Sequence, residues 1–182
     1  MTETANVVRV QSSEQVTAPG QRGKVLVAAV GYVFARDLSV GPHLVTVLKD
    51  LDWSPMIEVD DWSFGPIDVV HRLHDRPGYY GRIVFVSSVE RGRTPGGVYT
   101  SRWAGELPDP AEVQARVGEA GAGVISLDNL LIVAEQFKAL PSEVFVVEVE
   151  PLDTGWGDGF SPVVEAALPE VIAAVRRLAL DG

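Results

Sequence analysis

Short apolar runs alternate with amphipathic segments along most of this chain. Four runs predict strands, and they cover residues 24–30 (KVLVAAV), 56–61 (MIEVDD), 82–88 (RIVFVSS) and 144–151 (VFVVEVEP). The first is a continuous apolar run, which is typical of a strand buried on both faces. A weaker run at 98–103 (VYTSRW) predicts a fifth strand at an edge of the sheet. The segment just before it, 91–97 (RGRTPGG), predicts a turn.

The segments between the strands repeat their apolar residues with helical spacing. Helices are predicted around Leu44–Leu51, over 66–75, from Asp109-Pro110 to near Gly118, from Ser126 to Phe137, and from Ser161-Pro162 to Leu178. Aspartate and serine are good N-caps, and proline suits the first helical turn. Strands that alternate with helices predict an α/β fold, whose mostly parallel or mixed sheet is covered on both faces.

Residues 1–22 (MTETANVVRVQSSEQVTAPGQR) show no periodic apolar face. They predict a flexible N-terminal arm, followed by a single domain over 23–182. The arm lacks the basic start and apolar run of a secretory signal, and no stretch of the chain approaches the roughly 18 apolar residues of a membrane span. We therefore expect a cytoplasmic protein that does not enter a membrane.

The composition excludes several kinds of chemistry. The chain has 182 residues, and 15 Lys and Arg against 25 Asp and Glu give a formal net charge of −10. Such a surface repels nucleic-acid phosphates, whereas a partner with a basic patch is easier to accommodate. There are no cysteines, which excludes disulfides, zinc–thiolate clusters and cysteine nucleophiles.

Polar residues gather where the predicted strands end. In open α/β sheets, ligands bind beyond the carboxyl ends of the strands. Here the segment from Tyr32 to Asp37 follows the first strand, Asp60 ends the second, and Ser87 and Ser88 end the third. Asp128, near the start of a later helix, can point the same way. These residues predict a crevice but do not define a reaction.

Motifs around these strand ends follow a recognisable order. Residues 29–41 (AVGYVFARDLSVG) place a Val-Gly pair, an acid and a second Val-Gly pair after a strand. Residues 83–98 (IVFVSSVERGRTPGGV) join a strand to a Pro-Gly-Gly turn. The last strand is followed by a Gly-rich loop and a Ser-Pro helix at 155–175 (GWGDGFSPVVEAALPEVIAAV). From about Lys24 to Leu178, this order resembles the endopeptidases that mature nickel–iron hydrogenases.

The resemblance implies a three-layer α/β/α sandwich with a five-stranded, mostly parallel, twisted sheet of the phosphorylase/hydrolase-like kind. Family members bind the precursor of the hydrogenase large subunit after nickel insertion and remove its C-terminal extension. They read the enclosed nickel with two acids and a histidine, whose positions fall here on Leu38, Ser87 and Asp128. Leucine cannot coordinate nickel and a neutral serine is a poor ligand, so only Asp128 offers a donor. No cofactor of its own is expected, and nickel enters only with a bound substrate.

We first interpret the chain as a hydrogenase-maturation-protease-like protein that binds the large-subunit precursor, either as a non-catalytic binding or chaperone module or as a divergent peptidase. The alternative is an active endopeptidase with a rearranged acidic site, in which Asp37 and Asp60 are catalytic and Asp128 is the third acid. A third hypothesis is a small-ligand-binding α/β protein. Substrate binding is assigned to Gly31, Tyr32, Gly41, Ser87 and Ser88.

Two weaker patterns are also present. Ser87, His43 and Asp60 are the residue types of a catalytic triad, with serine as nucleophile, histidine as base and aspartate to orient the histidine. The sequence around Ser87 lacks the G-x-S-x-G elbow that often carries such a serine. His71 and His74 have a spacing that can bind a metal, although a solvated surface is the simpler interpretation. The position of the acids distinguishes the main hypotheses, because converging carboxylates favour an active site and scattered ones favour a binding module.

Overall fold

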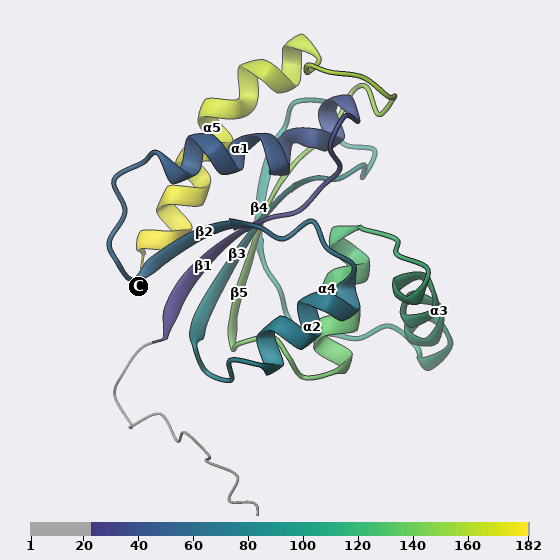
Figure 1. The fold of residues 1–182 in the computed structure, drawn as a ribbon. Helices are drawn as coiled ribbons and strands as arrows, with labels where there is room; N and C mark the ends of the chain where they lie inside the picture. The colour runs from purple at the N-terminus through teal and green to yellow at the C-terminus, as the bar shows by residue number, and fades with distance from the viewer. Residues whose placement is uncertain (1–22, 182) are drawn as a thin grey trace, which may run out of the picture.

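The computed structural model describes residues 23–181, so the predicted arm at 1–22 lies outside the described residues. A five-stranded sheet in the order β2-β1-β3-β5-β4 forms its centre (Figure 1). The strands are β1 (Lys24–Ala29), β2 (Ile57–Asp61), β3 (Tyr80–Ser88), β4 (Val98–Arg102) and β5 (Glu143–Val149). All pairs are parallel except β4, which runs antiparallel to β5 at the edge. The predicted mostly parallel sheet and its edge strand are confirmed.

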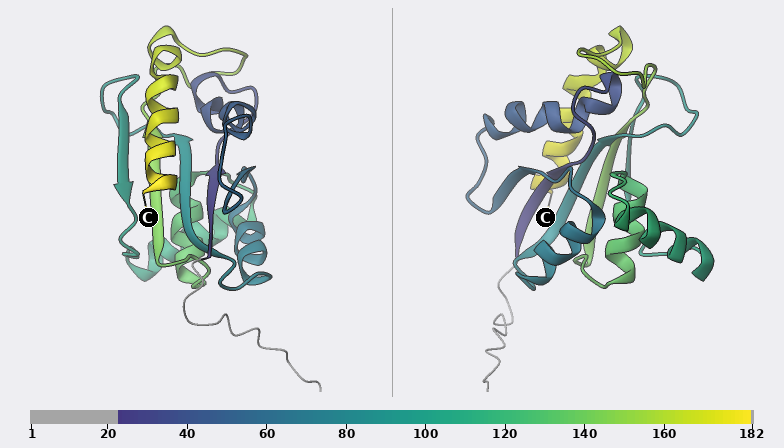
Figure 2. Two further views of the ribbon diagram at one scale, coloured as in Figure 1. Left: turned by 90° about the vertical axis from the view of Figure 1, so that its left-hand side faces the viewer. Right: turned by 45° about the vertical axis from the view of Figure 1, so that its right-hand side comes forward.

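Helices cover both faces of the sheet. They are α1 (Val40–Lys49), α2 (Pro66–His74), α3 (Pro110–Gly121), α4 (Leu127–Gln136) and α5 (Pro162–Leu180), with a 3-10 turn (Arg36–Ser39) before α1. Helices α1 and α5 lie on one face, α2 and α4 lie on the other, and α3 packs outside α4 (Figures 1 and 2). The three-layer α/β/α prediction is therefore confirmed.

Strand β3 contributes to the core on both sides of the sheet. Val84 and Val86 belong to the apolar cluster under α1 and α5, whereas Ile83 and Phe85 belong to the cluster under α2 and α4. None of these four side chains is exposed. Full burial of one such side chain contributes about 1.5–3 kcal/mol. Burial on both faces explains why the strand has a continuous apolar sequence and no apolar–polar alternation.

The predicted capping residues are confirmed at the starts of α3 and α4, whereas the hydroxyl of Ser161 before α5 donates to Asp37 and forms no cap. Asp109 accepts hydrogen bonds from the backbone N–H groups of Ala111 and Glu112, and Ser126 accepts one from Asn129. Helix α3 continues to Gly121 and does not end near Gly118, because the buried Ala120 packs against α2 and α4. Among residues 23–181, every helix is too short or too polar to span a bilayer.

Two glycines let the chain fold tightly between β1 and α1. A Cβ at Gly41 would lie 2.4 Å from the carbonyl oxygen of Val30, and a Cβ at Gly31 would lie 2.6 Å from that of Leu38. Both distances are shorter than any real contact, so a larger residue at either position would push the segment away. This close approach places residues 31–39 at the carboxyl edge of the sheet.

Candidate functional site

The carboxyl ends of β1 and β3 border a small pocket of about 160 Å³, called here the edge pocket. Half of its lining comes from residues assigned to substrate binding or lying at the nickel-reading positions of the family, and they are Gly31, Tyr32, Leu38, Ser87, Ser88 and Asp128. The remaining lining residues are Val30, Val89, Glu90, Ile125, Ser126 and Leu127. The structure therefore brings these distant positions together, whereas Gly41 lies outside the pocket against Val30.

The two serines at the end of β3 donate only to backbone carbonyl groups. The Oγ of Ser87 is 3.4 Å from the carbonyl oxygen of Ser88, and the Oγ of Ser88 is 3.3 Å from that of Val149. Among residues 23–181, no histidine or carboxylate accepts a hydrogen bond from Ser87, and His43 lines a different pocket. The Ser87–His43–Asp60 triad is therefore not assembled in this structure.

Asp128 is bound by an arginine that the sequence reasoning did not select. Two guanidinium nitrogens of Arg91 donate to its two carboxylate oxygens at 2.7 and 2.6 Å. The same guanidinium donates to Glu148 at 2.7 Å. The hydrogen bond to Asp128 raises the pKa of Arg91 above its ordinary value, burial acts against this, and Glu148 adds to the increase. Asp128 therefore faces the pocket as half of a bidentate ion pair.

A network of arginines and buried acids lies behind this pair. Glu150 is 2% exposed and accepts from the backbone N–H groups of Arg91 and Gly92, and also from the side chain of Arg93. Burial alone raises the pKa of Glu150, but these hydrogen bonds lower it below the ordinary value. Arg93 also donates to Glu148 at 2.8 Å. The network holds the predicted turn at 91–97 over the end of β5.

Asp37 is buried, and both of its carboxylate oxygens accept hydrogen bonds. Its carboxylate accepts from the backbone N–H groups of Leu152, Asp153 and Ser161, and from the hydroxyl of Ser161, at 2.7–2.9 Å. Burial raises the pKa of Asp37, but these hydrogen bonds lower it below its ordinary value. The donors are the N–H groups of Asp153, Ser161 and Leu152 and the hydroxyl of Ser161. Asp37 thus ties the turn before α1 to the loop before α5.

Backbone hydrogen bonds join the same two loops at a second place. Gly157 donates to the carbonyl of Phe34 and accepts from the N–H of Arg36, both at 3.0 Å. Phe34 and Arg36 have φ values of 65° and 42°, a conformation that is uncommon outside glycine and persists only where the surroundings hold it. Phe34 remains 57% exposed and Trp156, next to Gly157, is 80% exposed. The paired loops present apolar side chains to solvent on a fixed backbone.

The three acids of the alternative hypothesis do not share one site. Asp60 is the penultimate residue of β2, and its half-exposed carboxylate is 3.3 Å from the ammonium group of Lys49. Asp37 is enclosed by the loop before α5, and only Asp128 lines the edge pocket. Within residues 23–181, no group of three or more His, Asp or Glu side chains is arranged to hold a metal ion. His71 and His74 of α2 therefore belong to no such group. The three carboxylates therefore do not converge on one crevice.

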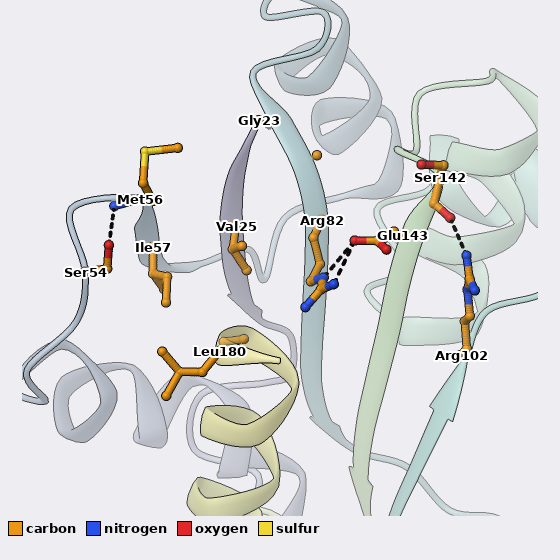
Figure 3. A pocket seen from close by; sticks show the side chains of 12 residues that line it. Gly23, Val25, Ser54, Met56, Ile57, Arg82, Arg102, Ser142, Glu143 and Leu180 are labelled. Atoms are coloured by element: carbon orange, nitrogen blue, oxygen red, sulfur yellow. Dashed lines mark hydrogen bonds and ion pairs between the residues drawn. The ribbon is translucent and has the colours of Figure 1, made fainter. Parts of the chain in front are cut away.

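A larger hollow of about 720 Å³ lies at the opposite, amino-terminal end of the sheet (Figure 3). Val25, Ile57 and Leu180 give it apolar walls, and Arg82 and Glu143 point toward each other from β3 and β5. The charged groups are already satisfied, because Arg82 bonds Glu143 and backbone carbonyls at the end of α5. None of the residues predicted for catalysis or binding lines this hollow.

No protein-family model matches the chain, and no curated protein matches it either. Solved structures do match. The hydrogenase 2 maturation peptidase of a Thaumarchaeota archaeon is 24% identical, with a TM-score of 0.57 over 84% of this chain and 95% of that one. The hydrogenase maturating endopeptidase HybD of E. coli is 20% identical, with a TM-score of 0.61 over 85% of this chain and 93% of that one.

A third structure extends the comparison. The [NiFe] hydrogenase maturation protease HybD of Thermococcus kodakarensis is 17% identical, with a TM-score of 0.54 over 86% of this chain and 99% of that one. At these identities the similarity establishes the shared fold. The predicted resemblance to hydrogenase maturation proteases is therefore confirmed at the level of the fold.

Proposed function

We propose that this chain, which has the fold of the hydrogenase maturation proteases, binds the large-subunit precursor of a nickel–iron hydrogenase without cleaving it. The fold supports the choice of partner, because the structures that it resembles are hydrogenase maturation proteases by name. The edge pocket carries the proposal. Leu38, Ser87 and Asp128 line it together, and Asp128 is already bound by Arg91.

Nickel enclosed in such a partner meets only two carboxylates in the edge pocket, those of Glu90 and Asp128, and among residues 23–181 no third His, Asp or Glu completes a metal site with them. Leu38 has no donor atom, and the hydroxyl of Ser87 is neutral and turned to a backbone carbonyl. Both oxygens of Asp128 accept hydrogen bonds from a guanidinium, so a metal ion would have to displace Arg91 from a bidentate ion pair. Recognition in this protein therefore depends on the shape and polarity of the partner, and it needs no resident metal.

Peptide hydrolysis requires an activated nucleophile or a base that can activate water. Among residues 23–181, no base accepts a hydrogen bond from Ser87, and the carboxylate of Asp37 is enclosed by four hydrogen-bond donors. Asp60 is paired with Lys49 outside the edge pocket. The arrangement supports binding better than cleavage.

The size of the edge pocket supports a macromolecular partner over a small ligand. Pockets for drug-sized ligands usually measure about 300–1,000 Å³, whereas the edge pocket measures about 160 Å³. A space of this size suits one protruding side chain of a larger partner. Tyr32 at its rim is 37% exposed and supplies contact area for the neighbouring residues of that partner.

Filling the edge pocket tests the proposal. Tagged full-length chain is incubated with a hydrogenase large-subunit precursor that keeps its C-terminal extension, and the captured precursor is quantified. We expect wild type to capture it, and Leu38→Trp to weaken capture at least tenfold because the indole occupies the pocket. Glu170→Ala, an exposed change on α5 away from the pocket, is the matched control and should leave capture unchanged.

A thermal melt of each variant confirms that it is folded. Failure of wild type to capture the precursor would contradict the proposal. Equal capture by wild type and a folded Leu38→Trp variant would show that the edge pocket is not where the partner binds.

A further inference from the structure

A second pocket, of about 500 Å³, lies beside the paired loops and is called here the loop pocket. The segment at 31–39 contributes to both pockets. Tyr32 and Leu38 line the edge pocket, whereas Val33, Phe34 and Ser39 line the loop pocket. A partner bound at the edge pocket is therefore separated from the loop pocket by a few residues of one loop.

Apolar and aromatic residues form one part of the lining of the loop pocket. The rings of His43 and Phe160 meet edge to face with centroids 4.9 Å apart, and Leu168 of α5 adds an aliphatic wall. Val33 and Phe34 are 78% and 57% exposed at its rim. Exposed apolar side chains around a concave surface mark an interaction site, because they gain free energy when a partner removes them from water.

The loops that form this pocket are held before any partner arrives. Gly157 pairs with the backbone of Phe34 and Arg36, and Asp37 accepts four hydrogen bonds from residues of the loop before α5. A preformed surface loses less conformational entropy on binding than a disordered one. The exposed position of Phe34 is therefore a property of the fixed backbone.

Negative charge without a neighbouring cation borders the loop pocket. Asp158 and Glu165 line it and are exposed, and no Lys or Arg is among its lining residues. Neither carboxylate forms an ion pair with any other residue in the described range 23–181. Arg36, the cation of the neighbouring loop, is already paired with Asp153 at 3.3 Å. The pocket therefore combines an apolar floor with two free carboxylates.

We propose that the loop pocket docks a peptide segment in which a large apolar side chain stands next to a lysine or arginine. The apolar side chain lies against Phe34 and the His43–Phe160 pair, and the cation is held by Asp158 and Glu165. This inference deepens the proposed function, since it assigns the segment to the same precursor that enters the edge pocket.

Short peptides test the docking directly. The probes are fluorescein-labelled Gly-Gly-Leu-Lys-Gly-Gly and the same peptide with Glu in place of Lys, titrated into the ¹⁵N-labelled full-length chain. We expect the Leu-Lys peptide to shift the amide signals of Val33, Phe34 and Phe160, and the Leu-Glu peptide to shift none. Asp158→Asn combined with Glu165→Gln should weaken the Leu-Lys peptide about tenfold, and Glu170→Gln should not.

Three results would overturn the docking proposal. These are the absence of shifts with the Leu-Lys peptide, shifts that map away from the loop pocket, and unchanged affinity in the Asp158→Asn, Glu165→Gln variant. The effect of charge is also screened, so higher salt should weaken the Leu-Lys peptide.

Capture of the precursor separates this proposal from the proposed function. If the Asp158→Asn, Glu165→Gln variant captures the precursor as well as wild type, the docking role for the precursor fails while the proposed function stands. If wild type binds the Leu-Lys peptide at the loop pocket but captures no precursor, the proposed function fails while the peptide site stands.

Discussion

At the scale of single residues, Asp37 is the anchor of the loops at the carboxyl edge. Its buried carboxylate accepts three N–H groups and one hydroxyl. In an asparagine at this position, the side-chain NH₂ group would replace one of the two accepting oxygens. The N–H and O–H donors that now bond to that oxygen would stay buried without an acceptor. We expect Asp37→Asn to lower the free energy of unfolding by about 2–3 kcal/mol.

Urea denaturation measures this loss, and Asp60→Asn is the matched control. Asp60 is half exposed and paired only with Lys49, so its replacement should cost about 0–1 kcal/mol. The two substitutions remove the same charge, and their difference therefore reports burial and hydrogen bonding. Equal small losses for both variants would contradict the anchoring role of Asp37.

The role of Asp37 also shows where sequence reasoning ends at this scale. An acid in a turn before a helix suggests a site residue or a local cap. Its actual partners lie 115–124 residues further along the chain, and nothing local encodes that contact. Likewise, the sequence indicated that Asp128 lies at the edge but not that Arg91 binds it.

At the scale of elements, the apolar patterns were sufficient to predict the strands and helices. Buried strands such as β1 and β3 have continuous apolar runs because both faces are covered, and the caps at Asp109 and Ser126 mark helix starts. Element ends shifted by a few residues where packing overrode the local signal, as at the end of α3. The strand order is set by packing between distant segments. The family resemblance implied a five-stranded, mostly parallel sheet, but no strand order was predicted.

Glu58 of β2 links three parts of the sheet and gives a prediction at this scale. It accepts from the ammonium of Lys24 and the hydroxyl of Tyr79, both at 2.6 Å, and from the hydroxyl of Tyr80 at 2.7 Å. Burial alone raises the pKa of Glu58, but the hydrogen bonds from Lys24, Tyr79 and Tyr80 lower it from 4.5 to about 2. Its ionised form therefore stabilises the fold.

The sign of the pH dependence follows from this lowered pKa. The stabilisation is fully present at pH values above the pKa that Glu58 has in the unfolded chain. It is lost as the pH falls through the lower pKa that Glu58 has in the folded protein. Between about pH 5 and pH 2, we expect the melting temperature of wild type to fall more steeply than that of Glu58→Gln. Thermal melts across this range measure both slopes, and parallel curves would show that Glu58 does not carry the effect.

At the scale of the whole molecule, the sequence predicted the location of the edge pocket better than its chemistry. Parallel strands end at one edge of the sheet, so residues after β1 and β3 had to meet there. The arginine network behind the pocket was missed. Glu148 in the otherwise apolar end of β5 and Glu150 directly after it were the available signal, because buried carboxylates need partners. Which partners they take depends on how the turn at 91–97 folds back.

Binding without cleavage is tested most directly by the intact mass of the partner. A hydrogenase large-subunit precursor with inserted nickel and its C-terminal extension is held in complex with the full-length chain, and its mass is recorded over hours. We expect a stable complex in which the mass of the precursor does not change. Loss of the mass of the extension with wild-type chain, and not in its absence, would contradict the proposal and show that the chain is a peptidase.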